Sequence, residues 1–222
     1  MIGILVALAI SWLLLYFVEK KSIAVLGVVP TVRNMTQFLT GFLVTAVLCV
    51  GTQYLDKILR GSVWTMNDWQ RVPGMLWWDF KSVLMEELMF RGALLYILIR
   101  RIGPSKAILI SAAAFGVLHW FSFGVLGNVI PMLFIFAGTG MMGYAWALAF
   151  AKTRSIMMPL GFHLGWNMLH NTIFSMGPLG AGLISSSGGI QIANWFSLIG
   201  LLGVPVIVIL FVRYVQKESP SS

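Results

Sequence analysis

Charged residues are scarce in this sequence. Asp, Glu, Lys and Arg together make up 10% of its 222 residues, whereas a soluble domain contains about 25%. Hydrophobic residues make up 59%. This balance excludes an ordinary soluble domain and indicates an integral membrane protein.

Cysteine and carboxylates are also scarce. The single cysteine, Cys49, excludes a disulfide within the chain. Only 7 acidic residues oppose 15 basic ones, and the net charge of +8 would suit a nucleic-acid-binding protein. Most of the basic residues, however, lie in short connections between apolar runs, so we expect no nucleic-acid partner.

Seven apolar runs are each long enough to cross a bilayer as a helix. They cover residues 1–18, 35–55, 74–99, 106–123, 125–151, 156–174 and 192–214. The first lacks the basic start and the small-residue cleavage site of a signal peptide, so we expect it to be retained. We expect the fifth to be interrupted near Pro131, and the Gly- and Ser-rich residues 175–191 to form a mobile loop. The sequence therefore predicts one all-α domain, residues 1–222, folded as a polytopic transmembrane helix bundle.

The distribution of basic residues tests this count of seven spans. If the connections alternate between two sides, one side receives ten basic residues, at positions 20, 21, 33, 100, 101, 106, 152, 154, 213 and 217. The other side receives four, at positions 57, 60, 71 and 81, and Arg91 lies within a span. Short cytoplasmic loops carry the excess of Lys and Arg. We therefore expect a multi-pass protein of the cell membrane with its N-terminus outside and its C-terminus in the cytoplasm.

The third apolar run contains a charged cluster, residues 86–91, with the sequence EELMFR. On insertion scales each charge at the centre of a bilayer costs roughly 2.5–3.5 kcal/mol. Three unpaired charges would cost on the order of 8–10 kcal/mol, against roughly 0.3–0.6 kcal/mol gained per large apolar residue. These groups must therefore face protein, and an ionisable cluster inside a membrane is a functional-site hypothesis.

Helical spacing divides this cluster into two parts. Glu87 and Arg91 are four residues apart and share a helix face, so we expect an ion pair between them. Glu86 points about 100° away around the helix and is left for another partner. A carboxylate in an apolar surround suits a general base that works near neutral pH. A purely structural salt-bridge network of the three residues is the alternative.

All three histidines of the chain also fall inside apolar runs. His119 follows Phe115 by four residues, and a second stripe along one helix face consists of His163, Asn167 and His170. Each histidine alone could be a packed residue that donates to a backbone carbonyl. Together with the acidic cluster they predict a polar site between the third, fourth and sixth spans.

Two glycine patterns are assigned to helix packing. Residues 138–143 match the spacing of a dinucleotide-binding fingerprint, which carries meaning only between a strand and a helix of a soluble unit. Inside an apolar span such small residues let helices approach closely. Gly161 and Gly165 are interpreted in the same way, and because they bracket His163, close packing there would also position this histidine.

The functional groups favour hydrolysis. The sequence contains no Gly-Xaa-Ser-Xaa-Gly elbow, no His-Glu-Xaa-Xaa-His zinc motif and no aspartate pair suited to an aspartyl protease. A carboxylate and an imidazole can hold and deprotonate a water, while a second imidazole and a carboxamide can donate to the developing oxyanion. This combination predicts cleavage of an amide bond by an activated water. A proton-coupled transporter is the rival, although no paired inverted repeat is present.

Three motifs in this chain resemble those of a known family. They are EExxxR at residues 86–91, FxxxH at 115–119 and HxxxN at 163–167. Their order on successive polar spans is similar to that of the CPBP family, the CAAX-protease and bacteriocin-processing (ABI, Rce1-like) intramembrane endopeptidases. The motif-bearing core of the chain is residues 74–174.

The resemblance implies a role for each motif residue in an intramembrane endopeptidase. The water would be activated by Glu86 and His119. The oxyanion would be stabilised by His163 and Asn167. The supporting residues would be Glu87, Arg91 and Phe115. His170 lies outside the motifs, and we expect it to pack in the core.

Members of this family are described both as metalloproteases and as glutamate proteases. A zinc site needs three protein ligands and an open position, and Glu86, His119 and His163 could supply the ligands. Asn167, on the same face as His163, is better explained as an oxyanion donor. We therefore expect no metal or other cofactor, and a zinc-dependent protease is the alternative.

The resemblance also limits the substrate. Eukaryotic members remove the last three residues of prenylated CAAX proteins, and prokaryotic members are associated with peptide or bacteriocin processing, self-immunity and membrane-protein maturation. The sequence contains no prenyl-binding signature. We expect a membrane-associated protein or peptide with a hydrophobic or prenylated end, which enters laterally from the lipid bilayer. A bacteriocin-immunity scaffold without catalysis is a further alternative.

Overall fold

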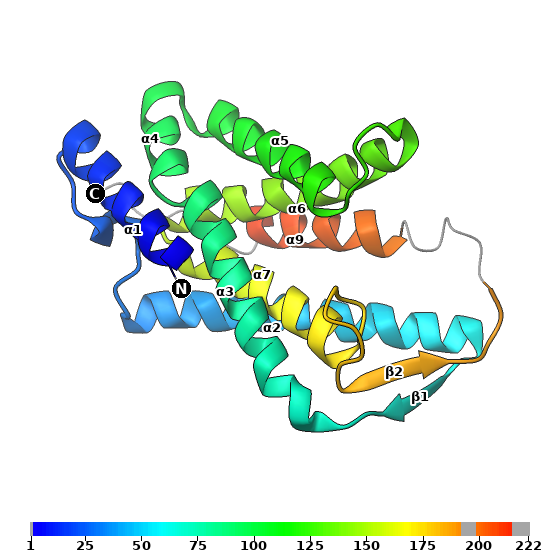
Figure 1. Ribbon diagram of the computed structural model, residues 1–222. Coiled ribbons are helices and arrows are strands. Elements are labelled where there is room, and N and C mark those ends of the chain that lie inside the picture. Colours follow the sequence, from blue (N-terminus) through cyan, green and yellow to red (C-terminus); the bar gives the residue numbers. More distant parts are fainter. Residues whose placement is uncertain (1, 192–198, 215–222) are drawn as a thin grey trace.

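A computed structural model describes residues 2–191 and 199–214, and helices dominate it (Figure 1). The α-helices are α1 (Ile2–Leu14), α2 (Val32–Arg60), α3 (Val72–Arg91), α4 (Ala93–Ile102), α5 (Pro104–Ser122), α6 (Val129–Thr153), α7 (Met157–Asn167) and α9 (Val204–Tyr214). π-Helical turns follow α1 (Leu15–Glu19) and α7 (Met168–Ile173) and precede α9 (Ile199–Gly203), and 3-10 turns lie at Ile23–Leu26 and Trp69–Arg71. The prediction of a mostly helical chain is confirmed.

Four segments are long and apolar enough to cross a membrane: Ile2–Glu19, α2, α5 and α6. Gly200–Tyr214 is a shorter apolar helix, and the first part of the seventh predicted span, residues 192–198, lies outside the described residues. The chain is therefore a helical membrane protein. The count of seven spans and the orientation of the termini stay predictions, because α3 and α7, which carry the polar motifs, are not among the four segments.

Two predicted spans differ in detail from the expectation. The third is broken into α3 and α4 at Gly92, where ψ is −139° and an added Cβ would collide with the carbonyl oxygen of Leu88. A helix cannot continue through this ψ value, and the collision leaves no room for a side chain at this position. The fifth is not interrupted near Pro131. This proline lies in the first turn of α6, where backbone N–H groups have no partner within the helix.

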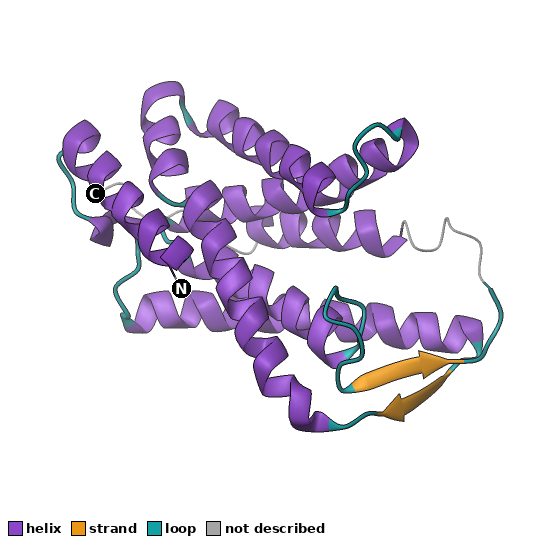
Figure 2. Cartoon of the chain, viewed as in Figure 1, coloured by secondary structure: helices purple, strands orange, loops and turns teal. Residues whose placement is uncertain are grey.

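The fold also contains two short strands that the sequence analysis did not predict (Figure 2). β1 (Val63–Met66) pairs antiparallel with β2 (Ile184–Ser187). The chain is therefore not all-α, and residues 175–191 are in part a paired strand rather than a loop. Because β1 follows α2 and β2 follows the turn after α7, the pair joins two connections that are distant in sequence.

Contacts among the connections sort them into two ends of the molecule. At one end, Arg100 makes an ion pair of 2.8 Å with Glu19, and the backbone N–H of Ile156 donates to the carbonyl of Leu26. These contacts join the connections after α1, α4 and α6. The β1–β2 pair joins the connections after α2 and α7. These five connections fall into the same two groups as in the strict alternation, whereas these contacts do not place the connection after α5, residues 123–128, in either group.

α7 is enclosed by α2, α3 and α6, and residues 158–165 of this helix are all buried. Its close contact with α2 depends on glycine, because a Cβ at Gly161 or Gly165 would collide with the carbonyl oxygen of Phe38 or Phe42. In the same contact, the hydroxyl of Thr45 donates to the Phe162 carbonyl at 2.7 Å. The interpretation of this glycine pair as a helix-packing motif is confirmed.

Candidate active site

Arg91 is the last residue of α3, and its positively charged side chain is fully buried. Its Nη1 donates to Oε1 of Glu87, one turn earlier, at 3.1 Å, and its Nη2 donates to the Gly143 carbonyl on α6 at 3.2 Å. Its guanidinium carbon lies 4.3 Å from the ring centroid of Phe115 on α5, a position in which a cation is attracted to the aromatic face. The structure thus contains the expected ion pair, and Arg91 in addition joins α3 to α5 and α6.

His163 connects this ion pair to α7. Its Nδ1 lies 2.8 Å from Oε1 of Glu87. That oxygen also accepts from Arg91, so the ring nitrogen is the donor. The sequence analysis paired Glu87 with Arg91 alone, whereas the structure shows that Glu87 also binds His163. A carboxylate in this position fixes the orientation and tautomer of a functional imidazole.

Glu86 is the carboxylate that lacks a strong partner. Its Oε2 is buried, has no hydrogen-bond partner among the described residues and lies 3.9 Å from Nε2 of His163. Its Oε1 accepts a long hydrogen bond of 3.4 Å from Ser82. The Glu86 side chain is 23% exposed, whereas that of Glu87 is fully buried. Of these two neighbours, Glu86 is the carboxylate that a water or a substrate can approach.

His119 lies in the last turn of α5, and one of its two ring nitrogens makes a hydrogen bond. Its Nδ1 donates to the carbonyl of Phe115, one turn earlier, at 2.7 Å, and the two rings are 4.4 Å apart between centroids. The His119 ring is close enough to Glu86 and His163 to interact electrostatically with both. Because the backbone carbonyl holds Nδ1, the nitrogen left for chemistry is Nε2.

Asn167 and His170 are not joined to these residues by hydrogen bonds. Asn167 ends α7 half-buried, and within the described ranges its carboxamide has no hydrogen-bond partner. His170 stacks on Trp166 at 5.5 Å, and its Nδ1 lies 3.3 Å from Oδ1 of Asn171. The structure therefore brings the acidic cluster together with His163, but Asn167 joins the site only through its place one turn beyond His163.

Asp79 is a buried carboxylate that the sequence analysis missed. Its Oδ1 accepts from Nδ2 of Asn171 and its Oδ2 from Oγ1 of Thr172, each at 2.8 Å. Both donors belong to the π-helical turn after α7, so Asp79 ties this turn to α3. Asp79 precedes Glu86 by seven residues, two helical turns, and therefore shares its face. That spacing is the signal in the sequence that identifies Asp79 as part of the same polar surface.

The side chains do not form a three-ligand metal site in this geometry. A zinc ion needs three protein ligands and an open position. Across residues 2–191 and 199–214, no three His, Cys, Asp or Glu side chains converge closely enough to hold a metal ion. Nδ1 of His119 and Nδ1 of His163 are both engaged in hydrogen bonds. We therefore derive no catalytic step through a metal.

A comparison with protein families finds a match to the motif-bearing region of the chain. Residues 68–169 match the family described as type II CAAX prenyl endopeptidase Rce1-like, and the matched stretch contains all three motifs. Comparisons with curated proteins and with solved structures find no match. The three motifs on α3, α5 and α7 and the family match that covers them make residues 68–169 of this chain similar to the Rce1-like, CAAX-type prenyl endopeptidases of the CPBP family.

Proposed function

We propose that this protein cleaves peptide bonds with a water activated by Glu86 and His119, without a metal. The observation that carries the proposal is the contrast between two adjacent carboxylates. Glu87 is fully buried, and one of its oxygens accepts from both Arg91 and His163. Oε2 of Glu87 has no hydrogen-bond partner among the described residues, but it belongs to a fully buried side chain. The Glu86 side chain is 23% exposed and accepts a long hydrogen bond of 3.4 Å from Ser82. A general base has to be within reach of the water, and the exposure of Glu86 provides that access.

In this mechanism Glu86 and His119 act on the same water. Glu86 takes a proton from the water while the water oxygen attacks the carbonyl carbon of the peptide bond. Glu86 then passes that proton to the leaving amine. Nε2 of His119 accepts the second hydrogen of the water and orients it. The hydrogen bond from Nδ1 of His119 to the Phe115 carbonyl supports this assignment, because it holds the ring with Nε2 as the remaining nitrogen.

We assign stabilisation of the oxyanion to His163 and Asn167. The Asn167 carboxamide makes no hydrogen bond with the described residues, so its N–H groups are available as donors. His163 donates from Nε2 when both of its ring nitrogens carry protons, and that cation lies 2.8 Å from Glu87 and 3.9 Å from Glu86. A donor aimed at an oxyanion is often worth about 2.7–4 kcal/mol.

The proposed substrate is a membrane-associated protein or peptide with a hydrophobic or prenylated end. The matched family acts on prenylated, membrane-associated substrates. A substrate of this kind would reach the site from the bilayer, which is consistent with the apolar helices around the site.

The test compares Glu86→Gln with the wild-type enzyme in lipid vesicles. A library of membrane peptides, with and without prenyl groups, is incubated with each protein, and the products are identified by mass spectrometry. Glu86→Gln should lower the cleavage rate at least about 100-fold, within the range that general acid–base catalysis contributes. The matched control is Glu19→Gln, which removes a carboxylate that is bound to Arg100 at one end of the molecule and should leave cleavage unchanged.

Two outcomes would contradict the proposal. If Glu86→Gln cleaved as fast as wild type, Glu86 would not be the base, and if wild type cleaved no peptide, the transporter and immunity-scaffold alternatives would gain support. The metal-free mechanism has a separate test. Activity should survive exhaustive chelation, with elemental analysis showing no stoichiometric metal. Loss of activity that zinc restores would establish the metalloprotease alternative.

A further inference from the structure

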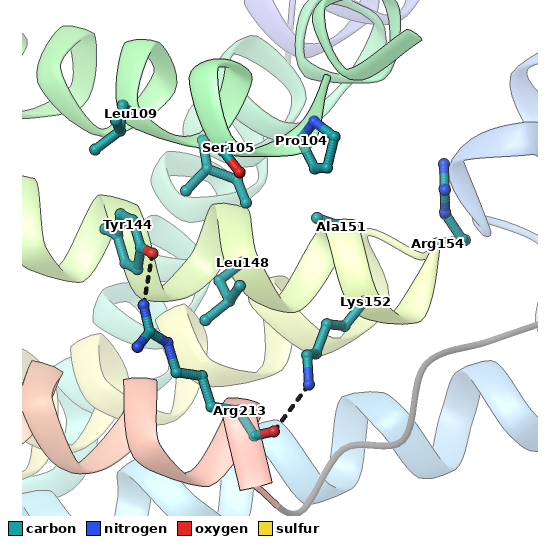
Figure 3. A pocket seen from close by; sticks show the side chains of 10 residues that line it. Pro104, Ser105, Leu109, Tyr144, Leu148, Ala151, Lys152, Arg154 and Arg213 are labelled. Atoms are coloured by element: carbon teal, nitrogen blue, oxygen red, sulfur yellow. Dashed lines mark hydrogen bonds between the residues drawn. The ribbon is translucent and has the colours of Figure 1, made fainter.

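A cavity of about 430 Å³ lies away from the motif residues, between the start of α5, the last turns of α6 and the end of α9 (Figure 3). Three basic residues line it: Lys152, Arg154 and Arg213. None of the residues that line it is acidic. The family assignment and the proposed mechanism do not involve this cavity.

The two arginines are available to an anion. Arg213 donates from Nη2 to the hydroxyl of Tyr144 at 3.0 Å, and Lys152 Nζ donates to the backbone carbonyl of Arg213 at 2.8 Å (Figure 3). The Tyr144 hydroxyl is neutral, so it does not compensate the charge of the Arg213 side chain. Neither Arg213 nor Arg154 makes a salt bridge with any carboxylate of the described chain. The two arginines lie at opposite ends of the cavity, and the side chain of Arg154 is directed away from Arg213 (Figure 3). A guanidinium group favours a phosphate or carboxylate ligand, which it binds through several N–H groups at once.

The start of α5 adds weaker donors at the same place. Its cap residue, Gly103, offers no side-chain hydrogen bond to the first turn, which contains Pro104 and Ser105. The N–H groups of a first turn have no partner within the helix, and the helix dipole favours a negative charge there. Pro104 and Ser105 both line the cavity, so this helix end reinforces the preference set by the arginines.

The remaining walls of the cavity are apolar. They include Ile108 and Leu109 of α5 and Leu148 of α6. Exposed leucines lie on both neighbouring helices: Leu109, in the cavity wall, is 59% exposed on α5, and Leu210, three residues before Arg213, is 47% exposed on α9. In a membrane protein such surfaces contact lipid acyl chains. A ligand that joins an anionic head to hydrocarbon chains therefore fits both parts of the site.

We propose that this cavity binds an anionic phospholipid, with the headgroup phosphate held by Arg213 and with Arg154 adding positive charge at the other end of the cavity. Basic pockets between transmembrane helices bind anionic headgroups, and this cavity lies at the end that carries most of the basic residues, which we predict to be cytoplasmic. The acyl chains follow the apolar faces of α5 and α9. The proposal concerns lipid binding alone and holds whether or not the protein cleaves peptides.

The test measures the lipid retained by the full-length protein. Purified protein is equilibrated with mixed micelles of phosphatidylglycerol and phosphatidylcholine and reisolated, and the retained lipids are counted by mass spectrometry. Wild type should retain phosphatidylglycerol in preference to phosphatidylcholine. Arg213→Gln should lower retained phosphatidylglycerol about tenfold, the equivalent of about 1.4 kcal/mol, because it removes a charged hydrogen-bond donor to the phosphate. Arg154→Gln, which removes a charge at the other end of the cavity, should lower it less. Lys106→Gln is the matched control, because it removes a positive charge from the first turn of α5 outside the cavity lining and should have no effect.

A further variant separates loss of lipid binding from loss of folding, which would also lower lipid retention in the arginine variants. Ser105→Glu places a carboxylate in the first turn of α5, where a negative charge stabilises the helix, and should nevertheless lower retained phosphatidylglycerol by repelling the phosphate. Equal retention of the two lipids by wild type, or an equal loss in Lys106→Gln, would overturn the proposal. Complete displacement of phosphatidylglycerol by inorganic phosphate would also overturn it, because the site would then bind phosphate without using the acyl chains.

Discussion

Replacing Arg91 with methionine should destabilise the fold far more than replacing Glu86 with glutamine. Arg91→Met keeps a long apolar side chain but removes the charge. It deletes the donors to Glu87 and Gly143, at 3.1 and 3.2 Å, and the guanidinium over the Phe115 ring. Glu87 then remains fully buried with His163 as its one donor among the described residues.

The magnitude follows from the burial of this ion pair. Removing one partner of a buried pair typically costs about 3–5 kcal/mol, because the other charge is left uncompensated. Since His163 still binds Glu87, we expect the lower end of this range for Arg91→Met, about 3 kcal/mol. Glu86→Gln changes a side chain that is 23% exposed and has a single 3.4 Å contact with Ser82, so its cost should stay below about 1 kcal/mol.

The double variant Glu87→Gln/Arg91→Met makes the reasoning testable. It contains no uncompensated buried charge, so its loss of stability should be smaller than the sum of the two single losses, by about 1–3 kcal/mol. Unfolding in mixed micelles titrated with sodium dodecyl sulfate, followed by tryptophan fluorescence, gives all four free energies. A loss below about 1 kcal/mol for Arg91→Met, or strict additivity in the double variant, would refute the argument that burial of the pair sets the cost.

The packing, the second carboxylate and the topology each give another expected outcome. Gly161→Ala should lower the free energy of unfolding by about 1–3 kcal/mol, because its Cβ would collide with α2, whereas Gly51→Ala, which has open space around it, should be neutral or stabilising; equal effects in the same unfolding assay would refute this. Asp79→Asn should cost about 1–3 kcal/mol, because one of its two hydrogen-bond donors loses its acceptor, and should speed hydrogen exchange in residues 168–173; unchanged exchange would show that Asp79 does not hold this turn. A reporter fused after Ser222 should be cytoplasmic and a tag before Met1 accessible from outside, and the reverse result would overturn the assignment from basic residues.

The parts of the site that lie within one helix could be predicted from the sequence. Residues four apart meet on a helix face whatever the rest of the fold does, and the structure contains the Glu87–Arg91 ion pair and the link from His119 to the Phe115 carbonyl. The hydrogen bond between Glu87 and His163 joins residues that are 76 positions apart. No spacing rule reaches across that distance, so the sharing of Glu87 between Arg91 and His163 could not be foreseen.

The elements that were missed have weak local signals. β1 and β2 are each four residues long, and their register depends on a partner about 120 positions away. The break at Gly92 comes from a backbone conformation, which an apolar run does not reveal. Asp79 is different, because its two-turn spacing from Glu86 was visible in the sequence. Its donors, Asn171 and Thr172, lie in the turn after α7 and could be assigned only from the fold.

The partners of α3 also determine when this helix can settle in the bilayer during synthesis. Gly143 is 52 residues beyond Arg91, and His163 is 76 residues beyond Glu87. When α3 first reaches the membrane, neither partner has been translated, and its charges disfavour entry into lipid. We therefore expect α3 to stay at the membrane surface or within the insertion machinery until α6 and α7 arrive. Chains truncated before residue 143 should accordingly be recognised and degraded as incompletely inserted.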